Sequence, residues 1–225
     1  MKQPRATTTA HDLAADRARA LTLTPVSRET SERLDRFVEL LLTWQKTTHL
    51  ISPSTIPTLW TRHVADSLQL IDLAPSARLW VDLGSGGGFP GVVIACALAE
   101  RPGAEIHLIE SNTKKAAFLR EAIRVTSAPG VVHPIRIEKF VANFSPVADV
   151  LTARALLPFK SLLDNSFSIL SRGTLGLFPK GQDVAAELTQ AAKYWKVAYT
   201  LAPSRTDSLA RIVVVRGLER RQVPE

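Results

Sequence analysis

A glycine-rich segment between a predicted strand and a predicted helix constrains the fold of this chain most. Residues 80–91 read Trp-Val-Asp-Leu-Gly-Ser-Gly-Gly-Gly-Phe-Pro-Gly, so an apolar strand runs directly into closely spaced glycines. Glycine lets a ligand approach the backbone, and the N-terminus of the following helix offers free N–H groups. The next predicted strand ends at Glu110, where a carboxylate can accept hydrogen bonds from both hydroxyls of a ribose. These two features predict a site for a nucleoside cofactor.

The rest of the pattern predicts an α/β fold with a doubly wound, mostly parallel sheet. Apolar runs predict strands at 79–83, 105–109, 131–137, 149–152 and 173–178, and helical patterns cover 91–99, 113–126, 159–171 and 183–194. Strands that alternate with helices indicate right-handed βαβ units and a parallel sheet. Two later runs, 197–201 and 211–216, predict an antiparallel strand pair that closes one edge of this sheet.

The N-terminal third is predicted to be helical and separate from the sheet. An apolar stripe runs from Leu34 to Leu42 after a Ser27 N-cap and predicts a helix that ends near Trp44. A second helix is expected from Ile56 to Ile71. We therefore divide the chain into a mobile arm (1–26), a helical appendage (27–75), a cofactor-binding domain (76–219) and a tail (220–225).

Composition narrows the class of protein. Hydrophobic residues make up 45% of the 225 residues, which is typical of a globular domain. A single cysteine, Cys96, excludes an internal disulfide and a cysteine-rich zinc site, and we expect no metal. The sequence has neither a signal peptide nor the ~20 apolar residues of a membrane span, which predicts a cytoplasmic protein, and we expect a monomer. The net charge of +7 favours a nucleic-acid partner, although such a charge can also serve solubility alone.

Two cofactors compete for the glycine-rich segment. Gly86, Gly88 and Gly91 satisfy the G-x-G-x-x-G pattern of dinucleotide sites, so the pattern alone leaves NAD open. The other register starts earlier, with Gly84 and Gly86 directly after the strand. That register resembles motif I of the class I methyltransferases, whose cofactor is S-adenosyl-L-methionine.

The methyl acceptor is narrowed by the motifs that are absent. Cys96 lies in the helix after the glycines, away from the position that a pyrimidine-methylating nucleophile would need. The Asp/Asn-Pro-Pro-aromatic turn of amino-group methyltransferases is missing after the fourth strand, where Arg154 stands instead. Guanine N7 carries a free lone pair and no proton, so its methylation requires alignment more than a base. Arg154 and Lys180, at the ends of the fourth and fifth strands, are the candidate catalytic cations that would orient the guanine.

The motifs resemble those of a known family. Residues 59–68, 82–91, 110–115, 152–155 and 180–181 together resemble the glucose-inhibited division protein B family, RsmG-type methyltransferases that modify guanine N7 in 16S ribosomal RNA of the small subunit. The resemblance covers residues 27–216. It implies that cofactor contacts come from Gly84, Gly86, Phe89, Glu110, Ser111, Asn112, Ile137, Glu138 and Arg154. The family's Trp-Asn-Lys-x-x-Asn-Leu segment departs here, since residues 44–50 read Trp-Gln-Lys-Thr-Thr-His-Leu.

Several interpretations stay open at this point. His63 and Asp66 share a helix face, and they could either reach the rim of the site or form a buried polar pair. The basic residues of the helix after Glu110 are interpreted as a solvated face. Three other functions remain as rivals: an NAD-dependent oxidoreductase, a non-catalytic ribosome-assembly factor, and a methyltransferase of small molecules.

Overall fold

The computed structural model describes residues 10–221, in which the strands form one mixed sheet. The strands are β1 (Leu79–Leu83), β2 (Glu105–Ile109), β3 (Gly130–His133), β4 (Val150–Thr152), β5 (Leu175–Lys180), β6 (Trp195–Pro203) and β7 (Arg211–Arg220). Their order is β3-β2-β1-β4-β5-β7-β6. The first five are parallel, β7 pairs antiparallel with β5, and β6 pairs antiparallel with β7. The predicted parallel sheet and its antiparallel closing pair are confirmed.

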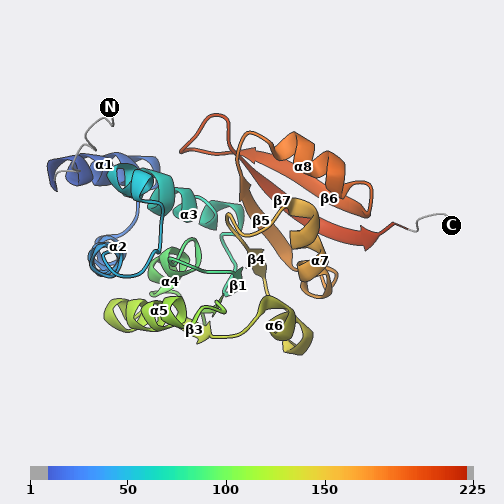
Figure 1. Cartoon of the computed structure of the whole chain (residues 1–225), viewed down its shortest axis with the longest axis horizontal. Helices are drawn as coiled ribbons and strands as arrows, with labels where there is room; N and C mark the ends of the chain where they lie inside the picture. The colour runs from blue at the N-terminus through green and yellow to red at the C-terminus, as the bar shows by residue number, and fades with distance from the viewer. Residues whose placement is uncertain (1–9, 222–225) are drawn as a thin grey trace.

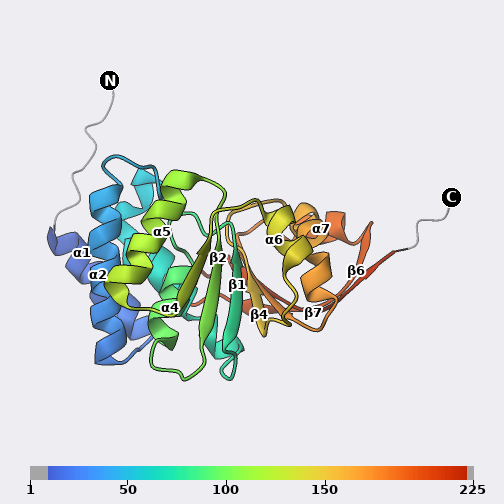
Figure 2. The ribbon, with the colours of Figure 1, turned by 90° about the horizontal axis from the view of Figure 1, so that it is seen from below.

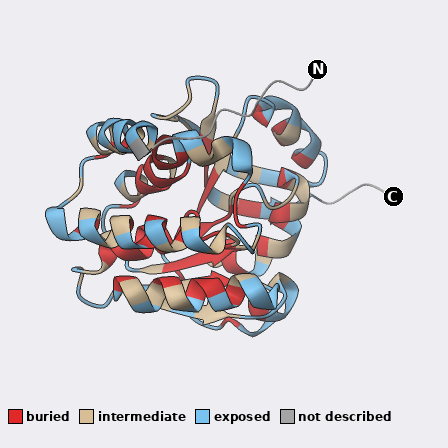
Figure 3. Cartoon of the chain, turned by 60° about the vertical axis from the view of Figure 1, so that its left-hand side comes forward, coloured by how far each residue is buried: buried red, intermediate tan, exposed pale blue. Residues whose placement is uncertain are grey.

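Helices cover both faces of the sheet (Figures 1 and 2). One face carries α2 (Arg28–Trp44), α4 (Gly91–Leu98) and α5 (Thr113–Thr126), and the other carries α6 (Ile137–Asn143), α7 (Phe159–Leu170) and α8 (Val184–Ala191). Because side chains alternate along a strand, Trp80 packs into the first layer and its neighbour Val81 into the second. Figure 3 shows the result, with buried strands in the centre and helices whose outer faces are exposed.

The N-terminal segment differs from the expected mobile arm. From Ala10 to Leu23 it forms helix α1, which packs on the appendage, whereas residues 1–9 lie outside the described part. Asp16 accepts hydrogen bonds from the backbone N–H groups of Trp60 (2.8 Å) and Thr61 (3.2 Å). Arg17 forms an ion pair with Asp35 at 2.6 Å. The prediction relied on weak apolar content, but these charged contacts, together with the buried Ala20 and with Leu13 and Leu21 packed on the core, hold the helix in place.

Helix α2 has the N-cap and the end that the apolar stripe predicts. The Ser27 hydroxyl accepts a hydrogen bond from the backbone N–H of Thr30 at 3.1 Å, which caps the helix. The side chains of Leu34, Phe37 and Leu41 are fully buried against the sheet domain. The appendage and the sheet domain therefore share one hydrophobic core.

The second predicted helix, 56–71, is broken into short pieces. These are η1 (Pro53–Thr58), the π-helical turn η2 (Trp60–Ala65), α3 (Asp66–Leu68) and η3 (Ile71–Leu73). Pro57 lies inside η1, where it lacks an N–H for a regular helical ladder. π-Helical turns are rare and occur often at functional sites. Here the turn carries His63 toward the sheet domain.

The prediction of a strand over 131–137 is wrong at its end. β3 stops at His133, before Pro134, which cannot donate to a strand ladder. Ile137 and Glu138 instead begin the unpredicted helix α6. At the other end of the domain, β7 continues to Arg220, and residues 222–225 lie outside the described part. Among residues 10–221, no helix has the length and apolarity to cross a membrane.

Candidate active site

The glycine-rich loop joins β1 to α4 and consists largely of bare backbone. Gly84 has φ +69° and Gly86 has φ +50°, in the left-handed region that other residues seldom adopt. A Cβ atom at Gly84 would lie 2.5 Å from Cδ1 of Leu156, so a side chain there would displace the end of Leu156. At Gly86 such an atom would meet only the Gly84 carbonyl oxygen, at 3.7 Å. The loop therefore needs glycine for its path and leaves its backbone accessible to a ligand at Gly86.

Asp82, in β1, anchors this loop from inside the protein. Its buried carboxylate accepts hydrogen bonds from the backbone N–H of Gly91 (3.1 Å) and from the Thr152 hydroxyl (3.0 Å). The pKa of Asp82 is raised to about 6, because burial disfavours the charged form more than these hydrogen bonds favour it. The side chain thus ties the first turn of α4 to β4. Sequence reasoning noted Asp82 only as part of the motif and assigned it no role.

Glu110 closes the loop from the end of β2. One carboxylate oxygen accepts from the backbone N–H of Gly86 (3.0 Å) and the other from that of Asn112 (2.7 Å). A carboxylate has about four acceptor positions, so about two remain for a diol. The Asn112 side chain accepts from the N–H groups of Lys114 and Lys115 and caps α5. The side chain of Asn112 thus caps a helix, Asn112 is not among the residues that line the cavity described next, and its contact with the cofactor stays a prediction.

A cavity of about 560 Å³ opens above the loop, where the carboxyl ends of the central strands meet. Apart from Asn112, the predicted cofactor residues line it: Gly84, Gly86, Phe89, Glu110, Ser111, Ile137, Glu138 and Arg154. The walls also include residues that sequence reasoning missed, namely Leu50, Ile51 and Ser52 from the appendage and Lys115 and Arg136 from the sheet domain. No sequence pattern pointed to Leu50, Ile51 or Ser52, because their contribution depends on how the two regions pack. We call this space the loop cavity.

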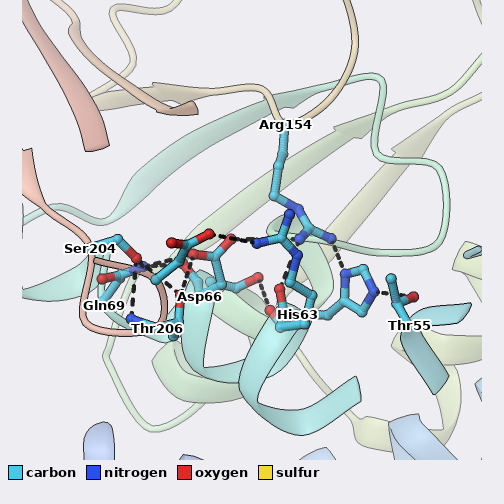
Figure 4. A network of polar contacts seen from close by, with 10 residues as sticks. Thr55, His63, Asp66, Gln69, Arg154, Ser204 and Thr206 are labelled. Carbon is cyan, nitrogen blue, oxygen red and sulfur yellow. Dashed lines mark hydrogen bonds and ion pairs between the residues drawn. The ribbon is translucent and has the colours of Figure 1, made fainter. Parts of the chain in front are cut away.

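Arg154, directly after β4, is held at one wall of the loop cavity by several contacts (Figure 4). Its Nη2 donates to Nδ1 of His63 at 2.6 Å, and its Nη1 donates to the Arg62 carbonyl oxygen at 3.2 Å. Nη1 also lies 3.5 Å from an Asp66 carboxylate oxygen, and the guanidinium is 5.3 Å from the centre of the Phe89 ring. Burial lowers the pKa of Arg154 while nearby carboxylates raise it, and arginine remains charged. The structure thus contains the fixed cation that the sequence predicted, whereas its catalytic role stays a prediction.

The contacts of His63 determine its protonation state. Arginine can only donate, so Nδ1 of His63 accepts from Arg154 and the ring proton is on Nε2. Nε2 then donates to the Thr55 hydroxyl at 2.8 Å, and that hydroxyl donates to the Ser52 carbonyl oxygen at 2.8 Å. Burial lowers the pKa of His63 to about 3, with further lowering by Arg154 and Arg62. His63 is therefore a neutral acceptor that orients Arg154.

Asp66 connects the same arginine to the loop between β6 and β7 (Figure 4). Its second oxygen accepts from the Thr206 hydroxyl (3.0 Å) and from the Gln69 amide (2.9 Å). The side-chain amide oxygen of Gln69 in turn accepts from the Arg205 backbone N–H at 2.9 Å. His63 and Asp66 thus do not pair with each other; each contacts Arg154. His63 lines both cavities and Asp66 lines the outer one, and their contacts with Arg154 join the appendage to the sheet domain.

A second cavity, of about 740 Å³, lies on the other side of Arg154, and we call it the outer cavity. The two cavities share a wall formed by His63, Arg154, Ala155, Leu156 and Leu157. Ala155 has φ +51°, a strained conformation for a residue with a side chain, and such strain tends to occur at functional sites.

Lys180 lies in the outer cavity and not in the loop cavity. Its ammonium group forms an ion pair with Glu187 at 2.7 Å and donates to the Leu157 carbonyl oxygen at 3.3 Å. Of the two predicted catalytic cations, Arg154 therefore borders both cavities and Lys180 borders one. Across residues 10–221, no group of three or more His, Cys, Asp or Glu side chains could hold a metal ion.

The strand order, with an antiparallel strand beside β5, is that of the class I methyltransferase fold. Dinucleotide-binding folds continue with a sixth strand beside the fifth, in the order 3-2-1-4-5-6. Here the antiparallel β7 occupies that place, between β5 and β6. The family follows from comparison with known proteins. A model of the family GidB, rRNA small subunit methyltransferase G, matches residues 30–210, and the chain belongs to this family.

Relatives with this description match nearly the whole chain. The ribosomal RNA small subunit methyltransferase G of Bradyrhizobium sp. (strain BTAi1) is 60% identical over 220 residues, which cover 98% of this chain and 99% of the relative. The protein of the same name from Bradyrhizobium sp. (strain ORS 278) is 57% identical over 221 residues, covering 98% and 100%.

Solved structures agree with the fold. A putative O-methyltransferase from Klebsiella pneumoniae matches with a TM-score of 0.58 and 12% identity, covering 92% of this chain and 98% of that one. Cofactor-bound Rv0187 from MTB matches with a TM-score of 0.61 and 12% identity, covering 96% and 99%. At this identity the likeness concerns the fold alone.

Proposed function

We propose that this chain transfers a methyl group from S-adenosyl-L-methionine to N7 of a guanine in 16S ribosomal RNA. The observation that carries the proposal is the pair of cavities that meet at one wall, with Arg154 fixed in that wall. A methyl transfer needs the donor and the acceptor side by side, held in line, and two adjoining cavities provide separate places for them. Membership of the family supports the same reaction.

The loop cavity fits the proposed cofactor. Its volume lies within the range of small-molecule sites, ~300–1,000 Å³. The open backbone at Gly86 and the remaining acceptor positions of Glu110 suit a ribose, and Ile137 offers an apolar surface for an adenine ring. When bound, S-adenosyl-L-methionine supplies a methyl group made electrophilic by the sulfonium. Arg154, at the far wall, would orient the methionine carboxylate or the acceptor.

The outer cavity is assigned to the target base. A ring nitrogen such as guanine N7 needs no base to remove a proton. His63 is the only histidine on either cavity within the described residues, and it is held neutral with both ring nitrogens engaged. No cysteine lines either cavity in that part of the chain. The cations Arg62, Lys180 and Arg211 line the outer cavity, in keeping with a polyanionic substrate. The proposed setting is the cytoplasm, and the proposed state is a monomer.

The direct test measures methyl transfer to ribosomal RNA. Small subunits and free 16S ribosomal RNA from a strain that lacks this gene are incubated with the purified protein and methyl-labelled S-adenosyl-L-methionine. Label in 16S ribosomal RNA is expected, and mass mapping should locate a single 7-methylguanosine. Label on another atom of the base would contradict the N7 assignment. A protein that binds the cofactor and labels neither substrate would instead be an assembly factor.

The cofactor assignment has its own test. A ligand that binds only the native state raises the melting temperature, so S-adenosyl-L-methionine should stabilise the protein and NAD should not. Stabilisation by NAD alone would overturn the proposal in favour of an oxidoreductase. Transfer of label to small nucleosides as efficiently as to ribosomal RNA would favour a small-molecule methyltransferase.

A further inference from the structure

The outer cavity contains an ion pair whose role the proposed function leaves open. Lys180, at the end of β5, and Glu187, on α8, both line this cavity and lie 2.7 Å apart. Their side chains are 12% and 30% exposed, so the pair is reachable but well shielded from solvent. We propose that Lys180 and Glu187 together recognise guanine, with Lys180 donating to O6 and Glu187 accepting from N1–H. This inference rests on the proposed function.

Each partner of the pair has hydrogen-bonding capacity left. An ammonium group has three donors, and Lys180 uses two of them, toward Leu157 and Glu187. One oxygen of Glu187 accepts both from Lys180 and from the Phe159 backbone N–H at 2.7 Å. The other oxygen, Oε1, accepts from no donor in the described part of the chain. The pair therefore offers one donor next to one acceptor.

This arrangement matches guanine and rejects adenine. Guanine presents an acceptor at O6 beside a donor at N1–H, whereas adenine presents an amino donor at C6 beside an acceptor at N1. Adenine would thus place a donor against Lys180 and an acceptor against Glu187. A site whose polar groups would be left unpaired or opposed by the wrong ligand discriminates strongly against it.

The contact between Lys180 and the shared wall is compatible with methylation at N7. Lys180 donates to the carbonyl oxygen of Leu157, which belongs to the wall shared with the loop cavity, and the same ammonium group pairs with Glu187. Along the edge of guanine, O6 lies between N7 and N1. In the proposed pose, O6 contacts Lys180, N1 contacts Glu187, and N7 faces the shared wall.

The test changes the base and the protein independently. After mass mapping has located the target, subunits are assembled with 16S ribosomal RNA that carries guanosine, inosine or 2-aminopurine at that position. Inosine keeps O6 and N1–H and lacks only the amino group, whereas 2-aminopurine lacks both O6 and N1–H. Methyl-transfer rates at limiting enzyme concentration are measured for the wild type and for Glu187→Gln. Asp183→Asn serves as the matched control, because it removes a carboxylate from the same cavity outside the ion pair.

The wild type should accept inosine nearly as well as guanosine and use 2-aminopurine much more slowly. Glu187→Gln should slow the methylation of guanosine and inosine by on the order of 10- to 100-fold, and that of 2-aminopurine by about twofold at most. Asp183→Asn should change the rate of methylation by the same factor on all three bases. Equal losses by Glu187→Gln on all three bases would overturn the proposal, as would loss on guanosine with none on inosine, which would assign the contact to the amino group.

Two readouts keep the result interpretable. Binding of S-adenosyl-L-methionine, measured by calorimetry, should be unchanged in Glu187→Gln, because Glu187 does not line the loop cavity. If that variant does not fold, the wild-type preference for inosine over 2-aminopurine decides alone, and equal use of the two rejects the inference. If the wild type methylates no substrate, the proposed function itself fails; transfer without base-dependent loss rejects only the recognition by Lys180 and Glu187.

Discussion

The two cavities that meet at Arg154 are built in different ways. The loop cavity takes its predicted cofactor contacts from short stretches of chain that follow β1, β2, β3 and β4, and the glycine loop contributes mostly backbone. The outer cavity is lined by side chains from the appendage, from β5, from α8 and from the loop between β6 and β7. Its cations are positioned by ion pairs and hydrogen bonds between those elements.

The difference explains which region a sequence can reveal. A site formed by backbone atoms requires particular local conformations, and glycines at a fixed spacing are the sequence pattern that allows them. A site made of side chains from distant segments has no comparable local signature, because its members are adjacent only after folding. The shared wall combines both kinds of construction, since Arg154 follows a strand but is oriented by His63 and Asp66 of the appendage.

Loss of Arg154 should have the largest effect, because this residue borders both cavities. Arg154→Ala is expected to lower the single-turnover rate of methyl transfer by ~100- to 1,000-fold, as for other preorganised charges at reacting groups. Arg154→Lys, which keeps the charge without the planar fork, should recover only part of the rate. Stopped reactions with labelled cofactor measure the rate, and thermal melting checks the fold. A folded Arg154→Ala protein with wild-type turnover would remove this residue from the mechanism.

Gly84→Ala should damage the loop cavity selectively. A Cβ there would lie 2.5 Å from Leu156, and left-handed backbone costs ~1–2 kcal/mol for a residue with a side chain. We expect the dissociation constant of S-adenosyl-L-methionine to rise by about 10- to 100-fold, measured by calorimetry. Gly103→Ala is the matched control, because Gly103 also has a left-handed backbone, at φ +74°, but a Cβ there would have no atom within 4 Å and Gly103 does not line the loop cavity. It should leave the dissociation constant unchanged, and an equal effect of the two variants would contradict a local role of Gly84 in binding.

Changes at His63 test the wall from the side of the appendage. His63→Phe removes the acceptor of Arg154 and should lower kcat by about tenfold, since an unpaired buried donor costs ~1–3 kcal/mol. His63→Asn places an amide oxygen near the position of Nδ1 and should recover part of that loss. With a pKa of about 3, His63 stays neutral above pH 5. The profile of kcat against pH should therefore show no step near pH 6.5 that depends on His63, and His63→Phe should leave the shape of the profile unchanged. Such a step would instead make His63 a proton-transfer group.

Asp82→Asn should have the smallest effect, on stability alone. The pKa of Asp82 is raised to about 6 in the folded protein from an ordinary value of 3.8, so folding favours the protonated form. Wild-type stability should therefore fall as pH rises from about 4 to 6 and be constant above, at a cost of up to about 3 kcal/mol. The asparagine variant lacks this dependence. Its melting temperature relative to wild type should rise across that window, and a constant difference would contradict the raised pKa.

Much of the fold could be predicted from the sequence, with errors at particular places. The predicted strand 105–109 and helix 113–126 have the observed bounds of β2 and α5. Helix α1 was missed because Asp16 and Arg17 hold it through contacts with distant residues. Helix α6 was not predicted, and only its first residue, Ile137, lay in the strand predicted over 131–137, since a short apolar run has no decisive period. The π-helical turn at His63 follows from packing that no local pattern encodes.

The candidate site divides in the same way. The sequence could indicate Gly84, Gly86 and Glu110 because their conformations and their order after strands are local properties of the chain. The side chain of Asn112 caps α5, a local use of this residue that the motif did not indicate. The cofactor contacts of all four residues stay predictions. His63 was left undecided and Glu187 was not considered. Their partners, Arg154 and Lys180, are 91 and 7 residues away in the chain.

By itself, the sequence determined the sheet, the glycine loop and the acid that follows the second strand, because hydrophobic period, turn conformation and chain order are local or additive along the chain. Tertiary structure alone decided that a helical appendage completes the loop cavity, that a neutral His63 orients Arg154, and that Lys180 pairs with Glu187 in a second cavity. The place of the appendage, the contact of His63 with Arg154 and the walls of the second cavity depend on distances between segments that are far apart in sequence. Such distances are set only when one packed core brings the segments together.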